Sequence, residues 1–182
     1  MLLEATERVV AKEGFRRATT NRIAEVAGVS IGTLYHYFPT KEALVQGLVH
    51  RLWWGELEAA MRHVGAFDTA PFDEAIGEVV RALLAHVGSK RELYRAWYAE
   101  AAHLGDLDQG LGMMAEAIAA FRSILEVRRS SLRVTDLEFA ADFTIKTAVA
   151  MARTGARDYP DRIESGQLAR EITDLLVRYL IP

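Results

Sequence analysis

Between residues 19 and 44 the sequence groups hydroxyl, imidazole and ammonium side chains at helical spacing. Leu34 and Phe38 are four residues apart, so they form the apolar side of a short helix. The opposite side of that helix carries Thr33, Tyr35, His36 and Tyr37. A face with hydroxyls, an imidazole and no carboxylate suits a groove lined by phosphates. The pattern therefore favours contact with a nucleic acid.

Two short helices joined by a tight turn are needed to position these side chains. Thr19 is a suitable N-cap for the first helix, and Ser30 is a suitable N-cap for the second. Gly28 ends the first helix, because glycine adopts a left-handed C-terminal turn without steric cost. These features predict a helix-turn-helix whose second helix is the recognition helix. The alternative is a helical hairpin of an all-α enzyme.

This segment resembles the DNA-binding domain of the tetracycline-repressor (TetR) family of bacterial transcriptional regulators. The resemblance covers about residues 1–50 and implies an all-α chain in two parts. These are a three-helix helix-turn-helix DNA-binding domain at 1–45 and a helical ligand-binding and dimerisation domain at 46–182. The matching residues are Gly14-Phe15, Thr19-Thr20, Ile23-Ala24, Ala27-Gly28-Val29-Ser30, Gly32-Thr33-Leu34-Tyr35, Tyr37-Phe38 and Lys41-Glu42-Ala43-Leu44.

The side chains around the recognition helix divide into two kinds of expected DNA contact. Thr33 and His36 are the expected readers of base edges, and Ile31 offers an apolar contact to a thymine methyl group. Family members often carry a polar residue at the position of Ile31. Gly32 lets the helix approach the bases. The phosphate contacts are expected from Arg17, Thr20, Arg22, Tyr35, Tyr37 and Lys41, and from the backbone amides that follow Ser30.

The charge distribution agrees with this division of the chain. Residues 1–54 contain seven Lys or Arg and five Asp or Glu, whereas the remainder contains 15 Lys or Arg and 20 Asp or Glu. The first part is therefore basic although the overall net charge is −3. A basic end on an acidic body directs phosphate attraction to that end.

The chain has no cysteine, no apolar run of membrane-spanning length and no signal-peptide pattern at its start, so we expect a cytoplasmic protein without a membrane partner.

Helical periodicity continues through the rest of the sequence, and no stretch alternates like a strand. After a first helix at about 2–13 and the helix-turn-helix at about 19–38, a long helix is expected from Thr40 to about Val64. A break at 65–71 follows. The remaining helices are expected at about 71–87, 90–104, 111–131, 135–156 and 165–181.

The family resemblance implies an effector cavity among the middle helices and a dimer interface at the end of the chain. Aromatic and methionine side chains suit an adaptable apolar site, and the expected lining is Trp97, Tyr98, Met114 and Phe121. Arg95, Glu100 and His103 are candidates for polar contacts. A four-helix interface about a two-fold axis is expected from Ala141, Ala148, Ala152, Leu168, Ile172, Leu175, Leu176 and Tyr179. The alternative is an intramolecular helix pair without a partner.

The sequence contains no convincing catalytic or metal-binding motif. The letters of Gly110 to Ala115 fit a dinucleotide fingerprint but lack a preceding strand, and the five histidines include no i, i+4 pair. We therefore expect no enzyme activity, no catalytic residue, no metal and no cofactor. The predicted function is a homodimeric repressor that binds a palindromic operator in double-stranded DNA and is released by a small hydrophobic effector. The alternative is a small-molecule-binding helical sensor without DNA binding.

Overall fold

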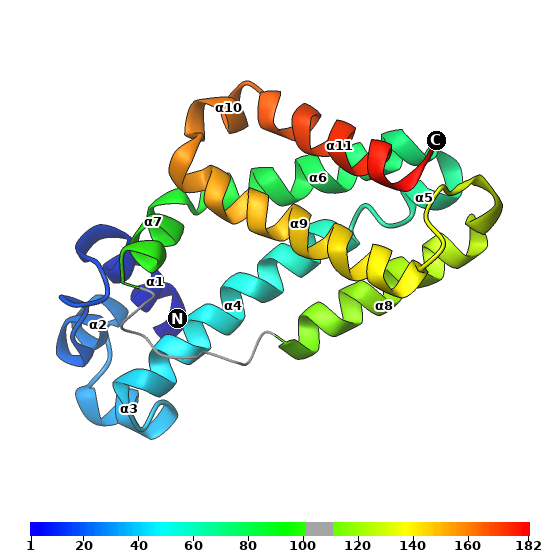
Figure 1. Cartoon of the computed structure of the whole chain (residues 1–182). Helices are drawn as coiled ribbons and strands as arrows, with labels where there is room; N and C mark the ends of the chain where they lie inside the picture. Colours follow the sequence, from blue (N-terminus) through cyan, green and yellow to red (C-terminus); the bar gives the residue numbers. More distant parts are fainter. Residues whose placement is uncertain (101–110) are drawn as a thin grey trace. The chain divides into compact units, whose positions relative to one another are not determined.

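The structure is a computed structural model that describes residues 1–100 and 111–182, and these residues form helices and no strand (Figure 1). The predicted all-α fold is confirmed. Among the described residues no helix is both long enough and apolar enough to cross a membrane. The helices are α1 (Leu2–Glu13), α2 (Thr20–Ala27), α3 (Ile31–Tyr37), α4 (Lys41–Met61), α5 (Ala66–Thr69), α6 (Phe72–Ser89), α7 (Arg91–Glu100), α8 (Leu111–Val127), α9 (Leu137–Asp158), α10 (Pro160–Glu164) and α11 (Gln167–Leu180).

Most predicted helices are present, and the differences lie at their ends. The predicted break at 65–71 contains the short helix α5, and α8 ends at Val127 and is followed by a 3₁₀ turn at Arg129–Ser131. The last part of the helix expected at 90–104 lies outside the described residues. Before α11 the chain forms α10, which begins at Pro160. Proline is favoured at the first helical position because its φ angle is already helical.

The chain folds as two compact units, each with its own apolar core. The first unit comprises Met1–Trp54 and the segment from Lys90 that contains α7, so it includes more of α4 than the predicted domain at 1–45. Within it, α1 packs against α2 and α7, and α2 packs against α3. Its largest fully buried apolar side chains are Val10, Phe15, Ile23, Leu34, Leu44, Leu48 and Leu93.

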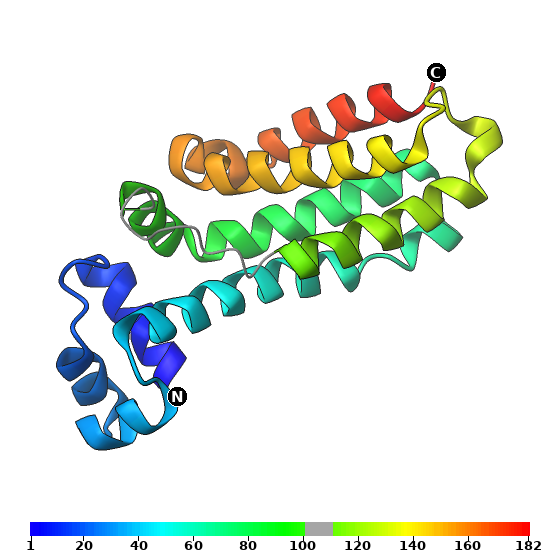
Figure 2. The same cartoon turned by 60° about the horizontal axis from the view of Figure 1, so that its bottom comes forward.

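The second unit comprises Gly55–Ser89 and Leu111–Pro182. Helix α6 packs against α9 and α11, and α8 packs against α9, so these four helices form a bundle (Figure 2). Helices α9 and α11 approach closely at Gly155, where an added Cβ atom would lie 2.4 Å from Cδ2 of Leu168. This glycine of α9 therefore allows close helix contact within the unit.

A buried ion pair joins the end of α4 to α9 inside the second unit. The Glu56 side chain is 4% exposed, and Arg153 donates from Nε to its Oε1 at 2.8 Å and from Nη2 to its Oε2 at 2.7 Å. A bidentate pair satisfies both carboxylate oxygens, which offsets the cost of removing the charges from water. The pair therefore fixes the position of α9 along the last turns of α4.

Replacing Gly155 by Ala should lower the free energy of unfolding by about 1–3 kcal/mol, because the new methyl group forces Leu168 out of its packed position. Gly112→Ala is the control, since a Cβ atom there meets nothing within 4 Å and alanine is the better helix former. Urea unfolding at one fixed protein concentration measures both changes. Equal stability of the two variants would contradict the close approach of α9 and α11.

Candidate nucleic-acid interface

Local capping interactions build the turn between α2 and α3. The Thr19 hydroxyl accepts from the amide of Arg22 at 3.2 Å, and the Ser30 hydroxyl accepts from the amide of Thr33 at 3.0 Å. Between the two helices Gly28 has φ +69°, a left-handed conformation that glycine adopts without steric strain. The three predicted signals of the helix-turn-helix are therefore confirmed.

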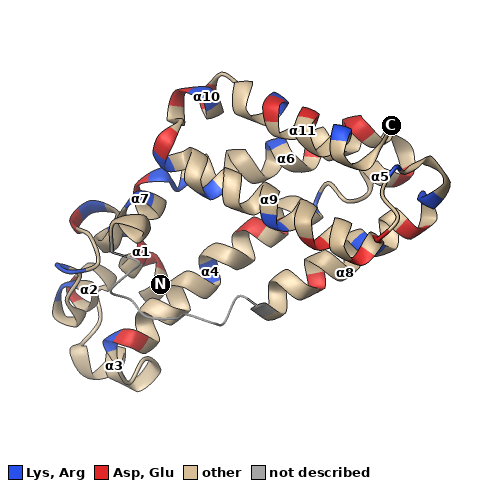
Figure 3. Cartoon of the chain, viewed as in Figure 1, with Lys and Arg blue, Asp and Glu red and all other residues tan. Residues whose placement is uncertain are grey.

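Helix α3 is attached to the first unit by its apolar side. Leu34 is completely buried, and Phe38 lies against α4, where an added Cβ atom at Gly47 would be 3.1 Å from Cε1 of the Phe38 ring. The opposite side of α3 is open to solvent, and it contains no Lys, Arg, Asp or Glu (Figure 3). The exposed residues of the helix as a whole are Ile31, Gly32, Thr33, Tyr35, His36 and Tyr37.

Some of the predicted contact groups are hydrogen-bonded to each other. The Thr20 hydroxyl lies 3.1 Å from the Tyr35 hydroxyl, and the Thr33 hydroxyl lies 2.8 Å from the Ser30 hydroxyl. The first pair joins α2 to α3, and the second closes the cap of α3. Each hydroxyl keeps capacity for one further partner, so these pairs hold the side chains in place without removing them from the interface.

The predicted cationic contacts differ in how strongly they are held by the protein. Arg22 pairs with Glu25 at 2.9 Å and with Glu13 at 3.1 Å, and these hydrogen bonds raise the pKa of Arg22. The Lys41 ammonium donates to the backbone carbonyl of Phe15 at 2.9 Å and is half-buried. Both groups therefore stabilise the first unit, besides any contact with phosphate.

The turn between α1 and α2 carries two adjacent exposed arginines, Arg16 and Arg17. Within the described part of the chain neither has an ion pair. Only Arg17 is among the predicted contacts, although Arg16 has the same charge and is also exposed. The pair therefore supplies exposed positive charge close to the start of α2.

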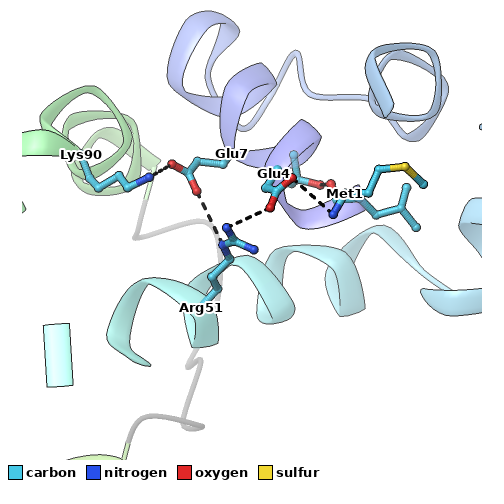
Figure 4. A network of polar contacts seen from close by, with 7 residues as sticks. Met1, Glu4, Glu7, Arg51 and Lys90 are labelled. Carbon is cyan, nitrogen blue, oxygen red and sulfur yellow. Dashed lines mark hydrogen bonds and ion pairs between the residues drawn. The ribbon is translucent and has the colours of Figure 1, made fainter. Parts of the chain in front are cut away.

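An ionic network holds α1, α4 and the start of α7 together (Figure 4). Arg51 lies 3.4 Å from Glu4 and 3.9 Å from Glu7, and Glu7 also binds the Lys90 ammonium. The Met1 ammonium, 3.4 Å from Glu4, and then Arg51 lower the pKa of the Glu4 carboxyl. The network therefore connects the helix that supports α2 to α7 within one compact unit.

The four residues predicted to line an effector cavity lie on two helices in different units. On α7, Trp97 and Tyr98 are partly exposed, and the Trp97 ring contacts Phe15 edge-on at 5.9 Å. On α8, Met114 is partly exposed, and Phe121 is buried against Phe67 at 5.9 Å. His103 and the side chain of Glu100 lie outside the described residues. The cavity stays a prediction.

The closing helices bury some predicted interface residues and expose others. Within the second unit Ala141, Ala152, Leu168, Ile172 and Leu176 are buried, and Ala148 is partly buried. Leu175 is exposed (52%). Phe139 (58%) and Phe143 (40%) are also exposed, although they were not among the predicted residues. The Phe143 ring lies 5.9 Å from Phe139 and 4.8 Å from Tyr179. The spacing of the two phenylalanines, four apart on one helix, is the signal that would have found this aromatic patch.

Comparison with known proteins gives two family matches along the chain. The model of bacterial regulatory proteins of the tetR family matches residues 2–48, and the model of the tetracyclin repressor-like C-terminal domain matches residues 71–180. Among curated relatives, the nucleoid occlusion factor SlmA of Haemophilus ducreyi is 43% identical over 42 residues, which are 23% of this chain and 21% of SlmA. The transcriptional regulator UidR of Escherichia coli is 38% identical over 48 residues, 26% of this chain and 24% of UidR. The chain therefore matches about a fifth to a quarter of the length of these relatives.

Solved structures are similar over nearly the whole chain. The TetR-family regulator PfmR of Thermus thermophilus has a TM-score of 0.70 at 20% identity, covering 97% of each chain. The Bacillus subtilis regulator FadR, solved in complex with stearoyl-CoA, has a TM-score of 0.73 at 19% identity, covering 98% of this chain and 97% of FadR. At such identities the likeness shows a shared fold. Since the C-terminal family model alone covers more than half of the residues and the N-terminal model covers the helix-turn-helix, the chain belongs to the tetracycline-repressor (TetR) family of bacterial transcriptional regulators.

Proposed function

We propose that this protein is a homodimeric repressor that binds a palindromic operator through α3 and leaves it when a small apolar effector binds. The single observation that carries the proposal is the open side of α3, where every exposed side chain is uncharged or an imidazole and Leu34 holds the opposite side in the core. A helix presented in this way fits the major groove, in which base edges are read.

The aromatic patch of Phe139, Phe143, Leu175 and Tyr179 supports the homodimer. These residues come from α9 and α11, and the rings of Phe139, Phe143 and Tyr179 contact each other in series. A contiguous exposed group of this kind marks an interaction surface. A two-fold dimer presents two copies of α3, and operator symmetry mirrors that of the protein.

The effector is proposed from the C-terminal family match and from the apolar interior of the second unit. There Phe67 packs on Phe72 at 5.6 Å and on Phe121 at 5.9 Å. FadR, which shares the fold, was solved in complex with stearoyl-CoA, so an effector with a long apolar chain is consistent with this scaffold. An effector that binds the DNA-free form more tightly shifts the population away from the operator by its differential affinity. The site of action is the cytoplasm, where operator DNA lies.

Selection of binding sequences from a pool of random duplexes tests the function directly. We expect enrichment of an inverted repeat whose half-sites are centred about 34–36 Å apart, or a compatible multiple. Arg17→Gln should lower the slope of log affinity against log salt concentration by about one unit, because one phosphate contact is lost. The control Arg122→Gln removes an exposed arginine of α8 and should leave the slope unchanged. Absence of any enriched sequence would favour the sensor without DNA binding.

Phe143→Glu should yield folded monomers, because a carboxylate cannot be buried unpaired in an apolar interface. Sedimentation at micromolar concentration measures the association state, and operator binding should weaken by at least about tenfold as the second half-site is lost. Val127→Glu is the control, since Val127 is the most exposed large apolar residue of the described chain and lies on α8. A monomeric unmodified protein, or an unchanged dimer in Phe143→Glu, would contradict the proposed interface.

A further inference from the structure

The chain passes between the two compact units inside α4, from Trp54 to Gly55, and again from Ser89 to Lys90, just before α7 begins. A further passage follows Gly110, next to residues outside the described ranges. These passages are covalent connections. The freedom of the first unit, which carries α3, therefore depends on how firmly the chain is held on its own side of each passage.

One carboxylate of the first unit binds a cation at each of the first two passages (Figure 4). Oε2 of Glu7, on α1, lies 3.9 Å from Nε of Arg51, which is one turn before Trp54 in α4. Oε1 of Glu7 accepts from the ammonium of Lys90, the first residue after the second passage. The Glu7 side chain is only 17% exposed. A single, largely buried side chain thus ties both passages to α1.

Glu4, one turn earlier on α1, has the same chemistry but a different set of partners. Within the described residues it pairs with Arg51 at 3.4 Å and makes no ion pair with Lys90. Its side chain is 55% exposed. Of these two carboxylates, Glu7 alone connects the start of α7 to α4.

Apolar contacts hold α7 on the first unit independently of Glu7. Helix α7 packs against α1, and Leu93 and Tyr94 are at most 2% exposed. The Trp97 ring contacts Phe15 edge-on at 5.9 Å. Loss of the Glu7 carboxylate should therefore loosen the chain at the two passages without unfolding the unit.

We infer that Glu7 is a positioning residue that sets which spacing of operator half-sites the protein binds. This inference rests on the proposed binding of DNA by a homodimer. One extra base pair between the half-sites moves the second one by about 3.4 Å and turns it by about a tenth of a turn. Two firmly held copies of α3 discriminate strongly against such a change, whereas loosely held copies tolerate it.

The test uses the full-length protein, the operator found by selection, and the same operator with one base pair inserted between its half-sites. The measured quantity is the ratio of the two affinities. In Glu7→Gln the inserted base pair should cost about two- to fivefold less affinity than in the unmodified protein, the range expected from partly exposed ion pairs.

Glu4→Gln is the matched control, because it removes the same charge from the same helix and leaves both contacts of Glu7 in place. It should keep the spacing ratio of the unmodified protein. Binding to a duplex with a single half-site should be equal in Glu7→Gln and Glu4→Gln, since neither residue is among the proposed DNA contacts. Helix content should be unchanged in both variants.

A double-mutant cycle then assigns the effect to one contact. Lys90→Gln should relax the spacing ratio as Glu7→Gln does, because the start of α7 loses the same tie. Glu7→Gln combined with Lys90→Gln should add little to either change, since residues that act through a shared contact are not additive.

The outcomes separate this inference from the proposed function. If selection yields an operator but Glu7→Gln keeps the unmodified ratio, or Glu4→Gln relaxes it equally, the spacing inference is wrong and DNA binding stands. If Glu7→Gln binds a single half-site more weakly than Glu4→Gln, Glu7 supports the fold of the unit and does not set the spacing. If no operator is found, the proposed function itself is overturned.

Discussion

A helix of seven residues is not stable in water by itself, and this constraint governs the whole interface. Helix α3 keeps its shape because Leu34 is buried in the core of the first unit and because Ser30 caps its first turn. Phe38 adds a contact at the other end, where Gly47 leaves room for the ring. Every group that α3 exposes is therefore oriented by one leucine, one cap and one aromatic ring.

The sequence predicts the helix-turn-helix well because its determinants are short-range. Thr19, Gly28 and Ser30 act on residues no more than about five positions away, so their roles can be read from the local pattern. The partners of the cations cannot be read in this way. Lys41 binds a carbonyl 26 residues earlier, and Arg22 binds a carboxylate nine residues earlier, and both contacts exist only once α1 is in place.

The closing helices show a second limit of sequence reasoning. An amphipathic stripe indicates that one side of a helix is covered, but it does not indicate whether the same chain or another one covers it. In α11, Leu176 is buried within its own unit, whereas its neighbour Leu175 is exposed and belongs to the aromatic patch. The two leucines are adjacent in sequence and face different surroundings, which only the tertiary structure distinguishes.

The absence of charge on α3 also has a consequence for how the protein finds its site. Non-specific affinity for DNA comes from cations that neutralise phosphates, and in the proposed interface the exposed Arg16 and Arg17 are the candidates for this role, outside α3. A recognition helix without charge gains little from an arbitrary duplex. If α3 reads DNA as proposed, we expect the surrounding chromosome to compete weakly for the protein and discrimination between sites to depend on how well a base sequence fits the helix surface.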